Sequence, residues 1–178
     1  MNSSLELLYL IIFSGILAVG YSYLLSGQIL SASAGNDKMK EIAEAIQIGA
    51  KAYLNRQYKT IAIVGLIVLI IVTYFFNILV GIGYFIGAAL SGVAGYVGML
   101  ISVQANVRTA EASRKSLQSG LSIAFKSGAI TGLLVAGLAL LSIAIYYLIL
   151  INLNTASRDI INALVALGFG ASLISIFA

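Results

Sequence analysis

Residues 61–100 read IAIVGLIVLIIVTYFFNILVGIGYFIGAALSGVAGYVGML, forty consecutive positions without a charged side chain. A helix needs about 20 largely apolar residues to cross the hydrocarbon layer of a bilayer. The stretch is therefore long enough for two crossings, and Asn77 is the polar residue that separates its two halves. It predicts two transmembrane helices joined by a tight turn.

The composition of the whole chain agrees with a membrane protein. Of its 178 residues, 61% are hydrophobic and only 9% are charged, and the mean hydropathy is +1.06. A soluble domain carries about 25% charged residues, which this chain lacks. It also has neither Cys nor His, which excludes disulfide frameworks, Cys/His zinc sites, thiol nucleophiles and Ser-His-Asp triads. The net charge of +4 does not indicate nucleic-acid binding, because the basic residues form no continuous run.

The apolar stretches predict an all-α, polytopic transmembrane helix bundle of about five helices, within one membrane domain that occupies residues 1–178. The expected spans are 5–25, 60–76, 78–103, 129–151 and 160–178. The fifth span is still apolar at Ala178, so we expect a helix that the sequence cuts short.

Basic residues are concentrated on one side of the expected bundle. Nine of the ten lie in the segments before the second span and between the third and fourth: Lys38, Lys40, Lys51, Arg56, Lys59, Arg108, Arg114, Lys115 and Lys126. Only Arg158 lies on the other side. Because short cytoplasmic loops carry the excess of Lys and Arg, we expect the N-terminus outside and both basic segments in the cytoplasm. Tyrosines near span ends are expected to anchor at the membrane interface: Tyr9, Tyr21, Tyr23, Tyr74, Tyr84, Tyr146 and Tyr147.

Residues 36–59 are the most charged part of the chain, and their apolar residues recur at helical spacing. Asn36 or Asp37 is expected to cap this helix, and Lys40 and Glu44 to pair at i,i+4. Since no Pro or Gly-rich break follows, one helix is expected over residues 37–76. Its length is about 60 Å at ~1.5 Å per residue, so its first half projects into the cytoplasm. The alternative is an amphipathic helix that lies on the membrane surface.

Small residues recur every four positions in two of the expected spans. They are Gly83, Gly87, Ser91 and Gly95 in the third span, and Gly128, Gly132 and Ala136 in the fourth. Such rows let helices approach closely in lipid, so both rows predict packing faces of a tight bundle.

Few residues could carry chemistry. Asp37, Glu41 and Glu44 share one helix face, a spacing that could hold a divalent metal ion, but the lysines beside them favour a solvated face. Arg108 and Glu111 are expected to form an i,i+3 ion pair. No charge lies in the middle of any span, where proton relays and transporter sites usually place one. The residues alone therefore assign no catalytic, cofactor-binding or metal-binding position.

Three stretches resemble the membrane-integral, ion-pumping inorganic pyrophosphatases in order and spacing. They are GNDKMKEIAEAIQIGAKAYLNRQYKTIAIVG (35–65), SGVAGYVGMLISVQANVRTAEAS (91–113) and GFGASLISIFA (168–178). They are similar to the family's long second helix, the end of its third helix with the following cytoplasmic loop, and its fifth helix. The resemblance implies a homodimeric enzyme of about sixteen helices per chain in two concentric rings. It also implies hydrolysis of Mg2+-bound diphosphate at a cytoplasmic funnel, with H+ or Na+ driven outward.

By this resemblance the chain is the N-terminal portion of such a pump in a bacterial inner membrane, with H+ preferred over Na+ as the transported ion. The family's substrate-binding motifs would begin after Ala178, so the chain alone is expected to be inactive. Two alternatives stay open: a self-standing small transporter or channel subunit, and a non-catalytic scaffold subunit that packs through its glycine rows. Reading the coding frame beyond Ala178 distinguishes them.

Overall fold

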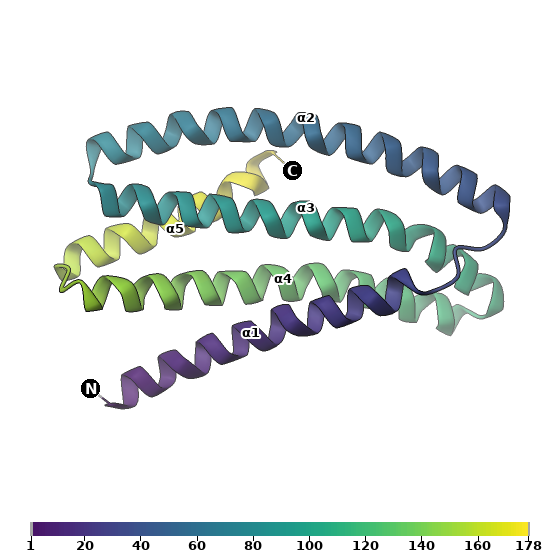
Figure 1. The fold of residues 1–178 in the computed structure, drawn as a ribbon, viewed down its shortest axis with the longest axis horizontal. Helices are drawn as coiled ribbons and strands as arrows, with labels where there is room; N and C mark the ends of the chain where they lie inside the picture. The colour runs from purple at the N-terminus through teal and green to yellow at the C-terminus, as the bar shows by residue number, and fades with distance from the viewer. Residues whose placement is uncertain (1, 178) are drawn as a thin grey trace.

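The computed structural model describes residues 2–177 of the chain, and the side chains of residues 5–173. The described part consists of α1 (Asn2–Leu30), α2 (Asp37–Phe75), α3 (Ile78–Lys115), α4 (Leu117–Asn152) and α5 (Ser157–Phe177). The first four helices run along the long axis of the molecule, and α5 crosses them obliquely (Figure 1). The predicted all-α bundle is confirmed for this part of the chain.

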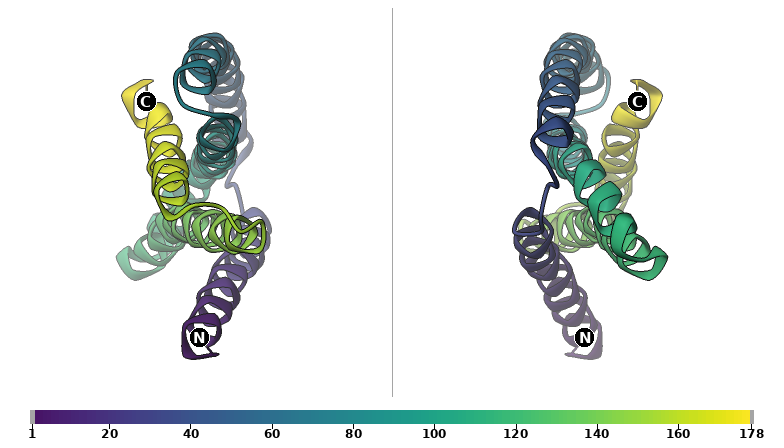
Figure 2. Two further views of the ribbon diagram at one scale, coloured as in Figure 1. Left: turned by 90° about the vertical axis from the view of Figure 1, so that its left-hand side faces the viewer. Right: turned by 90° about the vertical axis from the view of Figure 1, so that its right-hand side faces the viewer.

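Helix α3 lies at the centre of the bundle and contacts each of the other four helices. Seen from either end, α2 lies on one side of it and α4 and α1 on the other (Figure 2). Helices α1 to α4 are long and apolar enough to cross a membrane. The crossing by α5 stays a prediction.

The stretch over residues 61–100 forms the predicted hairpin of α2 and α3. Asn77 ends the turn and starts α3, because its side-chain Oδ1 accepts a hydrogen bond of 2.9 Å from the backbone N–H of Val80. This is an N-cap, which satisfies one of the free N–H groups at the start of a helix. A polar residue between two apolar runs therefore starts α3 immediately after α2.

Three helices are much longer than the expected spans. Helices α2, α3 and α4 have 39, 38 and 36 residues, which at ~1.5 Å per residue is nearly twice the hydrocarbon thickness. Residues 104–128, the basic segment between the expected third and fourth spans, do not form a loop. They are helical except at Ser116, whose side chain caps the start of α4. Polar residues end a membrane span, but they do not end a helix, and no proline interrupts this segment.

The continuous helix α2 was predicted correctly, with Asn36 as its N-cap, accepting from the Met39 N–H at 3.0 Å. Gly35 turns the chain into it with a positive φ of 82°, a conformation that side chains disfavour. The amphipathic half of α2 packs on α3 and buries Ala43 and Leu54. Residues 37–59 therefore belong to the same continuous helix as the span, and their position relative to the membrane surface stays a prediction.

The expected Lys40–Glu44 pair does not form. Instead Lys38 Nζ lies 2.9 Å from Glu41 Oε2, and Lys40 Nζ lies 3.1 Å from Asp37 Oδ1. Both pairs have i,i+3 spacing. Positions i+3 and i+4 are both neighbours on a helix surface, so spacing alone does not choose between them.

Two glycines of the α3 row form a packing face, as predicted, and their partner is α5. A Cβ atom on Gly83 would lie 2.3 Å from the Ala163 carbonyl oxygen, and one on Gly87 would lie 1.9 Å from that of Leu167. Both distances are shorter than any real side chain allows, so the two backbones touch. We call this contact the α3–α5 seam.

The row of α4 behaves differently. A Cβ on Gly128 or Gly132 would have no neighbour within 4 Å in the described chain, so the expected packing is not realised there. The packing glycine of α4 is Gly137, whose added Cβ would lie 3.0 Å from the carbonyl oxygen of Gly15 in α1. The row has the right spacing, but it lies on the face of α4 that is turned away from α1 and α3.

Two of the tyrosines predicted as interface anchors are buried in the bundle. Tyr84 and Tyr146 are 1% and 3% exposed. Tyr146 donates its hydroxyl hydrogen to the Leu79 carbonyl oxygen across the contact between α4 and α3. The prediction is wrong for these two, because their helical register turns them toward neighbouring helices, whereas Tyr9, Tyr21, Tyr23 and Tyr74 are exposed.

Candidate functional site

The charged residues collect at one end of the bundle, where α1 and α3 end and α2 and α4 begin (Figure 1). Seven of the ten basic residues belong to the helix halves at this end, which we call the basic end, and Arg56 and Lys59 lie near the middle of α2. Arg158 belongs to the first turn of α5 at the opposite end. The uneven distribution found in the sequence therefore corresponds to a spatial one.

The acidic residues of α2 do not form a metal site. Asp37 and Glu41 are solvent-exposed and each pairs with a lysine. In the described residues no three His, Cys, Asp or Glu side chains converge on a point where a metal ion could bind. Mg2+ requires several oxygen ligands in near-octahedral geometry, so these residues do not fit the ion that the family resemblance implies.

Arg108 connects α3 to the end of α1. Its guanidinium donates to the carbonyl oxygens of Leu30 at 3.0 Å, Ala32 at 3.2 Å and Gln104 at 2.7 Å. The expected pair with Glu111 is wrong: that carboxylate binds Arg114 at 2.9 Å. The last carbonyls of a helix lack intrahelical partners, and a planar group with five donors is well suited to satisfy them.

The sequence does not predict this contact, because Arg108 is 76 and 78 residues from its partners in α1 and the following turn. Backbone carbonyls carry no residue-specific signal. The only sequence feature that indicated a role for Arg108 was its place shortly after an apolar span.

A second polar contact joins the helices at the opposite end. The Asn77 side-chain amide donates to Asp159 Oδ1 at 3.2 Å, which connects the turn between α2 and α3 to the first turn of α5. Asp159 also lies where a negative charge favours the positive end of the helix dipole. Asp37 and Asp159 lie in the first turns of helices that begin at opposite ends of the molecule (Figure 1), so they cannot share a ligand.

The α3–α5 seam determines where α5 lies. Besides its glycine contacts, Ser91 Oγ donates to the Ala171 carbonyl oxygen at 2.7 Å. From α5, a Cβ on Gly170 would lie 2.1 Å from the Tyr84 carbonyl oxygen. The seam contains no charged group, so it supplies position and rigidity to α5 and no chemistry of its own.

These features define a class: a polytopic helical membrane protein whose described part has a basic end, a close-packed apolar interior and no convergent set of ionisable groups. The chain belongs to the family whose model is described as inorganic H+ pyrophosphatase, which matches residues 16–178. The match confirms the resemblance and extends it into α1, which the three resembling stretches do not include.

Named relatives agree with this assignment. A K(+)-insensitive pyrophosphate-energized proton pump of Methanosarcina mazei is 43% identical over 93% of the chain. A protein of the same description from Caldanaerobacter subterraneus subsp. tengcongensis is 37% identical over the whole chain. A putative K(+)-stimulated pyrophosphate-energized sodium pump of Bacteroides thetaiotaomicron is 38% identical over 97% of it. The chain spans about a quarter of the length of these relatives, between 24% and 27%.

Proposed function

We propose that the chain is the N-terminal portion of a pump that couples hydrolysis of inorganic diphosphate to outward transport of H+, in preference to Na+. The observation that carries the proposal is the family match over residues 16–178. The preference for H+ is supported by the relative that is 43% identical, which is described as a proton pump.

Within such a pump this chain acts as a scaffold. The α3–α5 seam holds α5 by backbone contacts, and Arg108 and Asn77 hold the two ends of the bundle. The groups that bind Mg2+ and diphosphate would lie in the remaining three quarters of the longer protein, since the described carboxylates do not converge. Electrostatic stabilisation of a multiply charged phosphoryl group needs such converging groups.

The proposed setting is the inner membrane of a bacterium, with the N-terminus outside and the basic end in the cytoplasm. Support comes from the uneven distribution of basic residues, because cytoplasmic segments carry the excess of Lys and Arg. The active form is proposed to be a homodimer, as the family resemblance implies.

A chimera tests this function. Residues 1–178 replace the corresponding quarter of the Methanosarcina mazei pump, and the purified protein is reconstituted into liposomes. We expect Mg2+-dependent phosphate release from diphosphate together with proton movement across the membrane. Two controls are the 178-residue chain alone and the relative without its first quarter, and both are expected to be inactive.

Each other outcome has a definite meaning. A chimera that elutes as a folded protein and neither hydrolyses diphosphate nor moves protons would contradict the proposal. Ion flux through liposomes that contain the 178-residue chain alone, without diphosphate, would instead favour a self-standing transporter or channel.

A further inference from the structure

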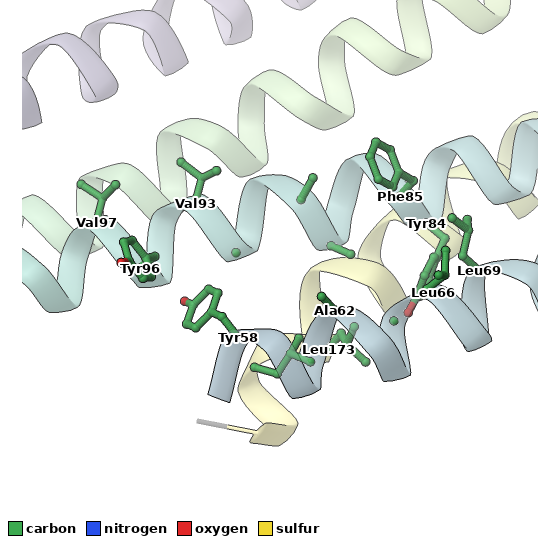
Figure 3. A pocket seen from close by; sticks show the side chains of 15 residues that line it. Tyr58, Ala62, Leu66, Leu69, Tyr84, Phe85, Val93, Tyr96, Val97 and Leu173 are labelled. Atoms are coloured by element: carbon green, nitrogen blue, oxygen red, sulfur yellow. The ribbon is translucent and has the colours of Figure 1, made fainter. Parts of the chain in front are cut away.

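An apolar groove runs along the contact between α2 and α3, and Leu173 of α5 closes its inner side (Figure 3). We call it the α2–α3 groove. Its volume is about 480 Å³. Side chains on its rim, such as Leu66, Phe85 and Val93, are more than half exposed. At this depth in the protein, an exposed apolar side chain faces lipid or another apolar partner.

The length of the groove matches one leaflet of a bilayer. On α2 its lining runs from Tyr58 to Leu69, eleven residues apart, or about 16 Å of helix. Half of a ~30 Å hydrocarbon core is about 15 Å. The end at Tyr58 lies toward the basic end of the bundle, so the groove covers the depth of the leaflet on that side.

The floor of the groove is apolar as well. Small residues, among them Ala62, Gly65 and Gly92, leave the space open. Tyr84 also lines the groove, but its hydroxyl oxygen is buried and has no hydrogen-bond partner among the described residues. Because this hydroxyl is buried, an occupant meets a mainly apolar wall, which suits an acyl chain.

Aromatic and polar side chains meet at the Tyr58 end of the groove, which we call its mouth. Tyr58 and Tyr96 meet edge to face, with ring centroids 5.2 Å apart, and the Tyr96 hydroxyl donates to Asn55 Oδ1 at 3.1 Å. This bond uses the side-chain oxygen of Asn55, and within the part of the chain that the structure describes its amide N–H groups stay available to an incoming acceptor. Lys59 follows Tyr58 in the sequence, is exposed, and makes no ion pair among the described residues.

We propose that the α2–α3 groove binds an anionic glycerophospholipid, with one acyl chain in the groove and the phosphate at Lys59 and Asn55. Charge decides the selectivity, because any lipid can supply an acyl chain. Basic pockets between transmembrane helices are known to bind anionic head groups, and each cation near the surface contributes about 1 kcal/mol, which is about a fivefold preference. The proposal depends on membrane insertion and not on pump activity.

Quenching of a single tryptophan by brominated lipid tests it. The chain contains no Trp, so Val93→Trp reports on the groove alone. Leu17→Trp in α1 is the matched control, since Leu17 is 55% and Val93 54% exposed. The two probes also lie at a similar depth in the bundle. Leu25 of α1 and Ile101 of α3 pack in one hydrophobic cluster, and the two helices run in the same direction. Leu17 and Val93 each lie eight residues before the cluster residue of their own helix.

The 178-residue protein is reconstituted in vesicles of phosphatidylcholine and phosphatidylglycerol, with either lipid brominated. At Val93→Trp we expect about a fivefold preference for phosphatidylglycerol, and at Leu17→Trp none. Adding Lys59→Gln should abolish the preference and leave quenching by brominated phosphatidylcholine intact, which shows that the variant is folded. Arg158→Gln, the same charge change at the opposite end, should leave the preference unchanged.

Two results would overturn the proposal. Equal quenching by the two lipids at Val93→Trp would mean that the groove holds ordinary annular lipid. Absence of quenching by both would mean that a second copy of the chain covers the groove.

Discussion

Replacing Gly87 by alanine tests whether the α3–α5 seam is a direct backbone contact. The new Cβ would lie 1.9 Å from the Leu167 carbonyl oxygen and 2.9 Å from the Ala171 backbone nitrogen. Ordinary van der Waals contact begins at 3.4 Å, so α5 must move away by about 1.5 Å or bend. The expected cost in unfolding free energy is at the upper end of the 1–3 kcal/mol range for overpacking. This movement of α5 also weakens the hydrogen bond from Ser91 to Ala171, and such a bond contributes about 0.6 kcal/mol in a membrane bundle.

Gly132→Ala is the matched control, because its Cβ would have no neighbour within 4 Å. Both substitutions gain about 1 kcal/mol of helix propensity. The difference between their unfolding free energies therefore measures the cost of the clash at the α3–α5 seam. We expect Gly87→Ala to lower the free energy of unfolding by about 2 kcal/mol and Gly132→Ala to raise it by about 1 kcal/mol.

The assay is unfolding of the 178-residue chain in mixed micelles with increasing sodium dodecyl sulfate, followed by circular dichroism. If the two variants changed the unfolding free energy by the same amount, α3 and α5 would not be in backbone contact, and the reasoning would be refuted.

Three further predictions concern orientation, rigidity and the turn between α2 and α3. A cysteine placed at Ser116 should react with a membrane-impermeant maleimide only from the cytoplasm, and one at Thr155 only from outside; the reverse pattern would invert the topology inferred from the basic residues. Spin labels at Ala45 and Ile63, both exposed on α2, should give one narrow distance near 27 Å, from eighteen residues at ~1.5 Å each, whereas a broad distribution would show a hinge. Asn77→Ala removes the N-cap of α3 and the hydrogen bond to α5, so it should cost about 1–2 kcal/mol of unfolding free energy; an unchanged value would mean that the turn does not depend on this side chain.

The sequence by itself was sufficient for the features that depend on local composition and periodicity. Forty consecutive residues without a charge, divided by Asn77, predict a transmembrane hairpin, because the backbone polar groups of an apolar segment in lipid must be hydrogen-bonded within a helix. The continuity of α2 followed from uninterrupted helical spacing, and the basic end followed from simple placement of Lys and Arg. The three stretches that resemble the pyrophosphatases were likewise sufficient for the family, as the match to residues 16–178 confirms.

Only the tertiary structure decided which of several equivalent surfaces make contact. The rows of Gly87 and Gly132 have the same spacing, yet one touches a backbone and the other touches nothing in the described chain. Arg108 had a carboxylate three residues away, but carbonyls at the end of α1 bind it instead. The physical reason is the same in each case: spacing along one helix defines a face, but the rotation and position of a distant helix determine what that face meets.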